Sequence, residues 1–211
     1  MLKYVNNLNI EDLFKDYNFK GGSLMKINYI TTNKFKVLVA KENLNPLGIE
    51  VEAKSIDCPE IQADTIEEVA KFSSKYASDF LQEDTLKNDS GLIIPALNGF
   101  PSAYTKYVEQ TIGVDGVLKL MEGIENREAY FVEVLAYTKY GQEPVTFVSK
   151  TAGKLAKVKS GEFGWSWDFV FIPNGESKTL GCYPDNERWK FWDNTAYEQL
   201  SNYLKEHSSN K

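Results

Sequence analysis

The chain has 211 residues, of which 42% are hydrophobic and 26% charged, a balance typical of a globular protein with one domain or two lobes around a shared core. Its net charge of −6 argues against a nucleic acid polymer as partner, because binding independent of base sequence needs a basic face. No apolar run approaches the length of a membrane span, and the first residues lack a signal-peptide core, so we expect no membrane association.

The cysteine and histidine content narrows the location and the chemistry. Two cysteines, Cys58 and Cys182, are too few for a disulfide framework and favour a reducing, cytoplasmic location. The single histidine, His207, lies in a polar tail, which argues against a zinc site and against catalysis by histidine.

The spacing of apolar residues predicts strands and helices in alternation along the chain. Strands are expected over 26–31, 49–56, 91–96, 129–137, 145–158 and 168–172. Helices are expected over 33–44, 65–80, 104–111, 114–121 and 195–205. A turn at 139–142 joins the two long strands, and no internal repeat is present. This mixture predicts an α/β or α+β fold with paired strands in its later half.

Two segments suggest a site for phosphate. Asn88-Asp89-Ser90-Gly91-Leu92 places a carboxylate beside a Ser-Gly turn, and Ala96-Leu97-Asn98-Gly99-Phe100-Pro101 leads to a cation at Lys106, an arrangement that suits a metal-bound phosphate. At Thr31-Thr32-Asn33 a strand gives way to a helix, whose N–H groups and dipole favour an anion, and Lys36 adds charge there. The alternatives are an ordinary strand, turn and helix start, and an Asn33 that only caps the helix.

In order and spacing these blocks, with Asp57-Cys58-Pro59-Glu60, Thr151-Ala152-Gly153-Lys154 and Phe171-Ile172-Pro173-Asn174-Gly175, resemble the inosine triphosphate pyrophosphatase family, of which the chain looks like a divergent member. The resemblance implies an elongated, twisted mixed β-sheet with flanking helices and two lobes around a nucleotide cleft. Residues 26–211 are expected to form this domain, and residues 1–25 an N-terminal extension.

The resemblance also implies roles for particular residues. Lys36 and Lys106 match family lysines that contact the triphosphate, and Glu60 and Asp89 match acids that hold Mg²⁺ and the attacking water. Asp89 and Lys36 are the expected catalytic residues. The implied reaction is hydrolysis of a purine nucleoside triphosphate to monophosphate and pyrophosphate, with Mg²⁺ neutralising the leaving group. The polar residues expected to bind substrate beside them are Thr31, Asn33 and Ser90.

Three positions depart from the family pattern. Many relatives place two acids before the Ser-Gly turn, whereas this chain has Asn88-Asp89, which is expected to weaken metal affinity. Ser73 stands where relatives carry a helix lysine, and the nearby lysines, Lys71 and Lys75, face about 200° away around the helix. Thr32 replaces a glycine, which narrows the backbone freedom of the turn.

The segment expected to read the base differs most. Relatives recognise a 6-keto group with Ser-His-Arg, whereas Trp192-Asp193-Asn194 aligns here. An ionised aspartate only accepts hydrogen bonds, so Asp193 favours an exocyclic amino group and Asn194 reads either kind of group, or the pair only caps the helix from 195. Arg188 falls at a family lysine that contacts the nucleotide, and it offers the missing donor.

The aromatic loop Phe163-Gly164-Trp165-Ser166-Trp167-Asp168 is longer than in relatives and allows two registers. In one, Phe163 stacks on the base and Ser166 takes the position of the family aspartate. In the other, Trp165 stacks, and Trp167 and Asp168 keep their family positions. The second is preferred because the strand over 168–172 then continues in register, so Trp165, Trp167 and Asp168 are expected to bind the base.

Two functions remain open. The first is an Mg²⁺-dependent pyrophosphatase acting on a purine nucleotide such as ITP, dITP or XTP, which the intact Glu60, Asp89 and Lys36 favour. The second is a catalytically weak nucleotide sensor that reports to an effector in an antiviral system, which the lost acid, the lost lysine and the extension favour. The family suggests a homodimer. A short amphipathic helix over 10–17 offers the alternative of a heteromeric partner.

Overall fold

A computed structural model describes residues 25–208, so the predictions made for residues 1–24, including the amphipathic helix over 10–17, lie outside the described residues. The described chain forms one six-stranded sheet in the order β2-β1-β3-β4-β5-β6. β1 runs parallel to β2 and to β3, and the other neighbouring strands are antiparallel. The mixed sheet with flanking helices confirms the predicted α/β class. The strands are Met25–Ile30 (β1), Ile49–Lys54 (β2), Thr85–Ile93 (β3), Glu128–Thr138 (β4), Val145–Leu155 (β5) and Phe171–Pro173 (β6).

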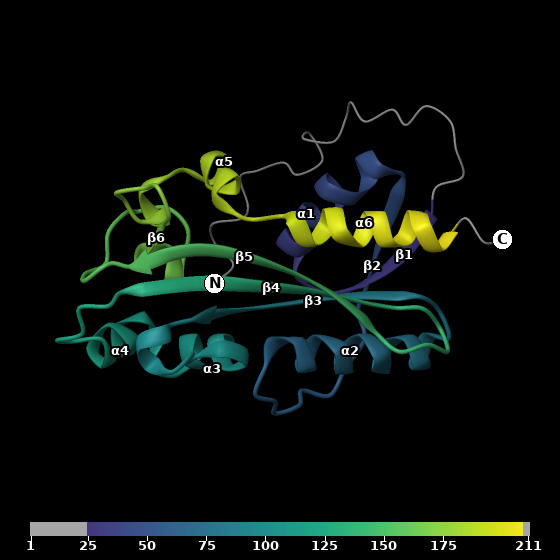
Figure 1. Ribbon diagram of the computed structural model, residues 1–211, viewed down its shortest axis with the longest axis horizontal. Coiled ribbons are helices and arrows are strands. Elements are labelled where there is room, and N and C mark those ends of the chain that lie inside the picture. The colour runs from purple at the N-terminus through teal and green to yellow at the C-terminus, as the bar shows by residue number, and fades with distance from the viewer. Residues whose placement is uncertain (1–24, 209–211) are drawn as a thin grey trace.

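Helices cover both faces of this sheet (Figure 1). α1 and α6 lie on one face, and α2, α3 and α4 lie on the other (Figure 1). None of the helices in the described part of the chain has the length and apolar character that a membrane crossing requires. The helices are Lys34–Leu44 (α1), Ile66–Leu81 (α2), Thr105–Gln110 (α3), Gly113–Leu120 (α4), Asp185–Arg188 (α5) and Thr195–Ser208 (α6).

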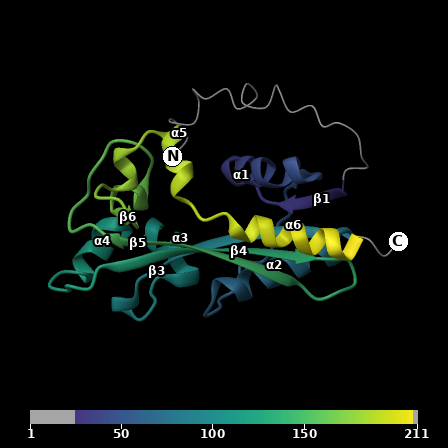
Figure 2. The same ribbon diagram turned by 45° about the horizontal axis from the view of Figure 1, so that its top comes forward.

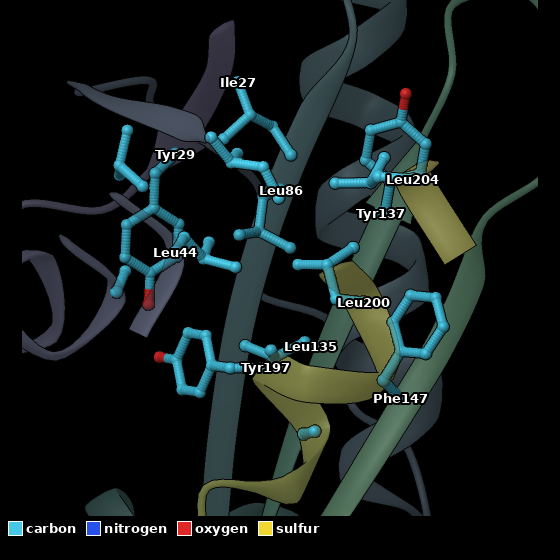
Figure 3. Close-up of a cluster of buried hydrophobic side chains, with 14 residues drawn as sticks. Ile27, Tyr29, Leu44, Leu86, Leu135, Tyr137, Phe147, Tyr197, Leu200 and Leu204 are labelled. Carbon is cyan, nitrogen blue, oxygen red and sulfur yellow. The ribbon is translucent and has the colours of Figure 1, made fainter. Parts of the chain in front are cut away.

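Each end of the molecule has its own hydrophobic cluster. The first packs α1 and α6 on the sheet around Leu86 and Leu135 (Figure 3). The second surrounds Leu92 and Phe171 and includes side chains of α3 and α4. In Figure 2 the elements of the second cluster gather at the end of the molecule opposite α1 and β1. Because β3, β4 and β5 contribute to both clusters, the two ends are joined by continuous strands.

Three strand predictions need correction. β3 begins at Thr85 rather than residue 91, because residues 85–93 pair with β4 along their whole length despite their polar side chains. β5 ends at Leu155, three residues before the predicted end. Residues 166–169 form a 3₁₀ turn, so the last strand begins at Phe171 and the strand predicted over 168–172 is wrong at its start. Asp168 lies in this turn, so the continuing strand that favoured the register with Trp165 as the stacking ring is absent.

The edge of β3 positions the site. β1 pairs with β3 through Asn28 and Tyr29 and ends at Ile30, so β3 runs on from Lys87 without β1 beside it. At its far end a bridge between Ile93 and Pro101 covers the same strand. Between Lys87 and Ile93 this edge of β3 has no strand of the described chain beside it, so side chains from other elements can contact its main chain.

Candidate active site

The turn between β1 and α1 is built by local hydrogen bonds. The Asn33 side-chain oxygen accepts from the N–H groups of Phe35 at 2.9 Å and Lys36 at 3.4 Å, and the Thr31 hydroxyl accepts from the N–H of Asn33 at 3.1 Å. Asn33 therefore does cap α1, as the alternative interpretation of this turn predicted. The cap fixes the first turn of the helix and with it the place from which Lys36 departs.

Lys36 reaches from α1 to the uncovered edge of β3. Its Nζ donates to the main-chain oxygen of Asn88 at 3.2 Å. Burial lowers the pKa of Lys36, and the nearby carboxylates of Asp89 and Glu133 oppose that shift. A cation is thus held at the sheet edge beside two acids.

Asp89 lies at the same edge and is partly buried. Its Oδ1 accepts the N–H of the exposed neighbour Ser90 at 2.9 Å. Burial raises the pKa of Asp89, and the charges of Lys36, Lys87 and Lys106 counteract it. The predicted catalytic pair, Asp89 and Lys36, is therefore brought together by the fold.

Glu60 and Lys106 form a looser pair nearby. Lys106 Nζ lies 3.6 Å from Glu60 Oε1, and both side chains are largely exposed, at 75% and 91%. The charge of Lys106 also acts on Asp89, which links this pair to the edge of β3. The contact comes from the start of α3 and from the loop that precedes α2.

The site offers few carboxylates to a metal ion. Within residues 25–208, no three acidic, histidine or cysteine side chains are arranged to hold a metal. Mg²⁺ usually takes one or two carboxylates and completes its shell with waters and substrate phosphates. As oxygen donors, Glu60 and Asp89 are compatible in chemistry with an ion that arrives with a phosphate-bearing ligand, and they do not form a closed protein cage.

The aromatic loop contacts the start of α1 through Trp165. The Trp165 side chain is 52% exposed and meets the ring of Phe35 edge-on, with centroids 5.9 Å apart. Trp167 is buried in the second hydrophobic cluster. Ser166 between them has φ of 52°, in the left-handed region, which lets the two rings take such different surroundings. Trp165 is thus an exposed ring in contact with α1, while Phe163, the stacking ring of the other register, is also exposed, at 37%.

Asp168 and Arg188 form an ion pair beneath that loop. Arg188 Nη1 lies 2.9 Å from Asp168 Oδ2, and Arg188 also bonds Asp185 in α5. The same Asp168 oxygen accepts the N–H of Trp165 at 3.0 Å. Burial raises the pKa of Asp168, and Arg188 opposes that shift. Gly164 packs against the pair, since a Cβ there would stand 1.7 Å from Arg188 Nη1.

Asp193 ties α6 to the sheet. Its two carboxylate oxygens accept the N–H of Thr195 at 2.9 Å and the N–H of Lys150 at 3.3 Å. Asn194, the next residue, is half-buried and accepts the Tyr197 N–H through its main-chain oxygen at 3.0 Å. The structure therefore supports the capping alternative for Asp193, which also borders a depression of about 310 Å³ beside Lys150 and Trp192.

Glu133 is a site residue that the sequence interpretation missed. It lies in β4 directly opposite Ser90, and its Oε1 accepts a hydrogen bond from Asn88 Nδ2. The signal was a single acid inside the apolar run Phe131-Val132-Glu133-Val134-Leu135, because a charge in the middle of a covered strand needs a partner.

The ion pair beneath the aromatic loop gives a testable expectation for stability. Arg188→Ala leaves Asp168 buried without its cation, so we expect the free energy of unfolding to fall by about 3–5 kcal/mol. Urea denaturation measures this. As a control, Lys159→Ala removes an exposed pair with Asp115 and should change the same quantity by less than about 1 kcal/mol. Equal effects in the two variants would contradict a structural role for the Arg188 pair.

Known proteins show the same fold and sequence pattern. Residues 27–193 match the model of the Ham1 family. A dITP/XTP pyrophosphatase of Methanopyrus kandleri is 42% identical over 182 residues, covering 86% of this chain and 97% of that protein, and one of Thermococcus kodakarensis is 38% identical over 183 residues, covering 86% and 98%. Among solved structures, the Staphylococcus aureus Ham1 protein superposes with a TM-score of 0.73 at 22% identity, over 86% of this chain and 99% of that one. The predicted family is thus confirmed, and the chain belongs to the Ham1 family.

Proposed function

We propose that the protein hydrolyses a non-standard purine nucleoside triphosphate, such as dITP, ITP or XTP, to the monophosphate and pyrophosphate. The observation that carries this proposal is the meeting of Lys36 and Asp89 at the uncovered edge of β3, with the Glu60–Lys106 pair close to both. The names of the relatives, dITP/XTP pyrophosphatase, support this class of substrate.

Each part of the site has a role in this reaction. Lys36 and Lys106 bind the phosphates, aided by the N-terminal dipole of α1, where Thr31 and Asn33 shape the turn. Asp89 orients the attacking water and accepts its proton. Glu60 and Asp89 would hold Mg²⁺, which when bound neutralises charge on the leaving pyrophosphate. Ser90, exposed beside Asp89, contacts the substrate through its hydroxyl.

The base lies at the aromatic loop in this proposal. Trp165 stacks on the purine, because its ring is exposed while Trp167 is buried and serves as support. Asp168 and Arg188 hold the loop through their ion pair, and Asp193 and Asn194 at the start of α6 complete the pocket for the base edge.

A nucleotide sensor with slow turnover is the second candidate. Asn88 is neutral where many relatives have an acid, and Ser73, which stands in place of a family lysine, is buried in α2 and brings no charge to the site. Such a subunit would report a bound nucleotide to an effector, for example in antiviral defence. Tight nucleotide binding without pyrophosphate release by the unaltered protein would favour this candidate.

The catalytic role of Asp89 is tested by Asp89→Asn. Loss of the base should lower turnover of dITP or XTP by at least about 100-fold. The measurement is pyrophosphate release with Mg²⁺ present, alongside nucleotide binding by calorimetry. Asp115→Asn, an exposed acid of α4, is the matched control and should keep full turnover. Unchanged turnover in Asp89→Asn would remove Asp89 from the mechanism.

The choice of base is tested separately by Asp193→Ala. If the carboxylate reads the base, the ranking of ITP, dITP, XTP and ATP by kcat/KM should change, because the acceptor is lost. If it serves only as the cap seen in the structure, the four values fall together or stay unchanged, and the ranking is kept.

We also infer that the protein is a cytoplasmic homodimer. Large apolar side chains are exposed around α3 and α4, and two of them, Phe100 and Leu120, line a depression of about 400 Å³. Burying these side chains against a second copy would stabilise the pair. Light scattering after gel filtration should give twice the chain mass of 24.0 kDa. A particle of one chain mass at micromolar concentration would contradict the dimer.

A further inference from the structure

Glu133 is an acid at the site for which the reaction above has no role. It lies in β4 between Ser90 of β3 and Ser149 of β5, which stand directly opposite it on either side. The three side chains therefore share one face of the sheet. Burial raises the pKa of Glu133, so a charge at this place needs polar or cationic neighbours.

The first neighbour is Asn88. This side chain is 3% exposed, and its amide nitrogen donates to Glu133 Oε1. The oxygen of the same amide, Oδ1, is buried and has no hydrogen-bond partner among the described residues. The orientation of the Asn88 amide is thus set by Glu133.

The second neighbour is Lys36. Its ammonium donates to the main-chain oxygen of the same Asn88, and it is attracted by the carboxylate of Glu133. Asn88 is therefore bonded at its backbone by the lysine and at its side chain by the acid. The three groups form a short network that joins α1, β3 and β4 at the strand edge.

Two buried hydroxyl groups from other elements also interact with Glu133. The hydroxyls of Tyr29 in β1 and Tyr197 in α6 are buried at the margin of the first hydrophobic cluster (Figure 3). Burial raises the pKa of both phenols, and the Glu133 charge adds to the shift. Glu133 thus interacts electrostatically with two buried phenols as well as with Lys36.

We propose that Glu133 is a positioning residue: it anchors the Asn88 side chain and attracts Lys36, and so fixes the ammonium at the place where the phosphates bind. This inference rests on the proposed function, because the value of a fixed Lys36 lies in its contact with a triphosphate. In this proposal the acid that many relatives carry at the position of Asn88 is replaced by a carboxylate on the neighbouring strand β4.

The proposal is tested by exchanging the amide and the carboxylate. Glu133→Gln removes the charge, so we expect the Kd for dITP or XTP and the KM to rise by about 10-fold, as for other residues that orient a binding group. The double variant Asn88→Asp/Glu133→Gln exchanges the two groups, so that position 88 carries the carboxylate and position 133 the amide. We expect it to recover most of the loss in Kd and KM. Glu128→Gln, an exposed acid of the same strand, should leave both constants unchanged.

The outcomes separate the inference from the function on which it rests. If the unaltered protein neither binds nor hydrolyses any purine triphosphate, the proposed function fails. If it does, and folded Glu133→Gln keeps the original Kd and KM, Glu133 has no positioning role. Additive losses in the double variant would also overturn the pairing, since coupled residues give non-additive effects. Should Glu133→Gln not fold, Glu133→Asp and the double variant give the same comparison.

Discussion

The bond between the Lys36 ammonium and the main-chain oxygen of Asn88 is the constraint on which the site depends. It exists because β1 stops at Ile30 while β3 continues, so a carbonyl that would otherwise pair with a strand accepts a lysine instead. The cation is therefore held by the topology of the sheet and by the cap that starts α1.

The motifs found in the sequence led to the correct family and to Lys36 and Asp89, which the fold brings to one strand edge. Asn33, Lys36 and Asp89 could be recognised because turn, cap and charge chemistry is local, and local chemistry is visible in a sequence. The beginning of β3 could not be predicted in the same way. Residues 87–90 are polar and resemble a loop, and they form a strand because β4 pairs with them residue by residue.

The remaining differences also come from long-range contacts. The role of Asp193 as a link between α6 and β5 depends on Lys150, 43 positions earlier in the chain. The exposed Trp165 and the buried Trp167 flank one left-handed residue, Ser166, and the loop is held by the Arg188 pair with Asp168, 20 positions earlier in the chain. Glu133 was overlooked because its partners, Asn88 and Lys36, lie on other elements.

The uncovered length of β3 has a consequence for solubility. A strand edge with free main-chain groups is a template on which another chain can add a strand and begin to aggregate. Here Lys36 occupies one carbonyl, Lys87 and Asp89 bring charge to the same stretch, and the bridge to Pro101 closes its far end. The groups proposed to bind a triphosphate thus also oppose the addition of a strand at this length of β3.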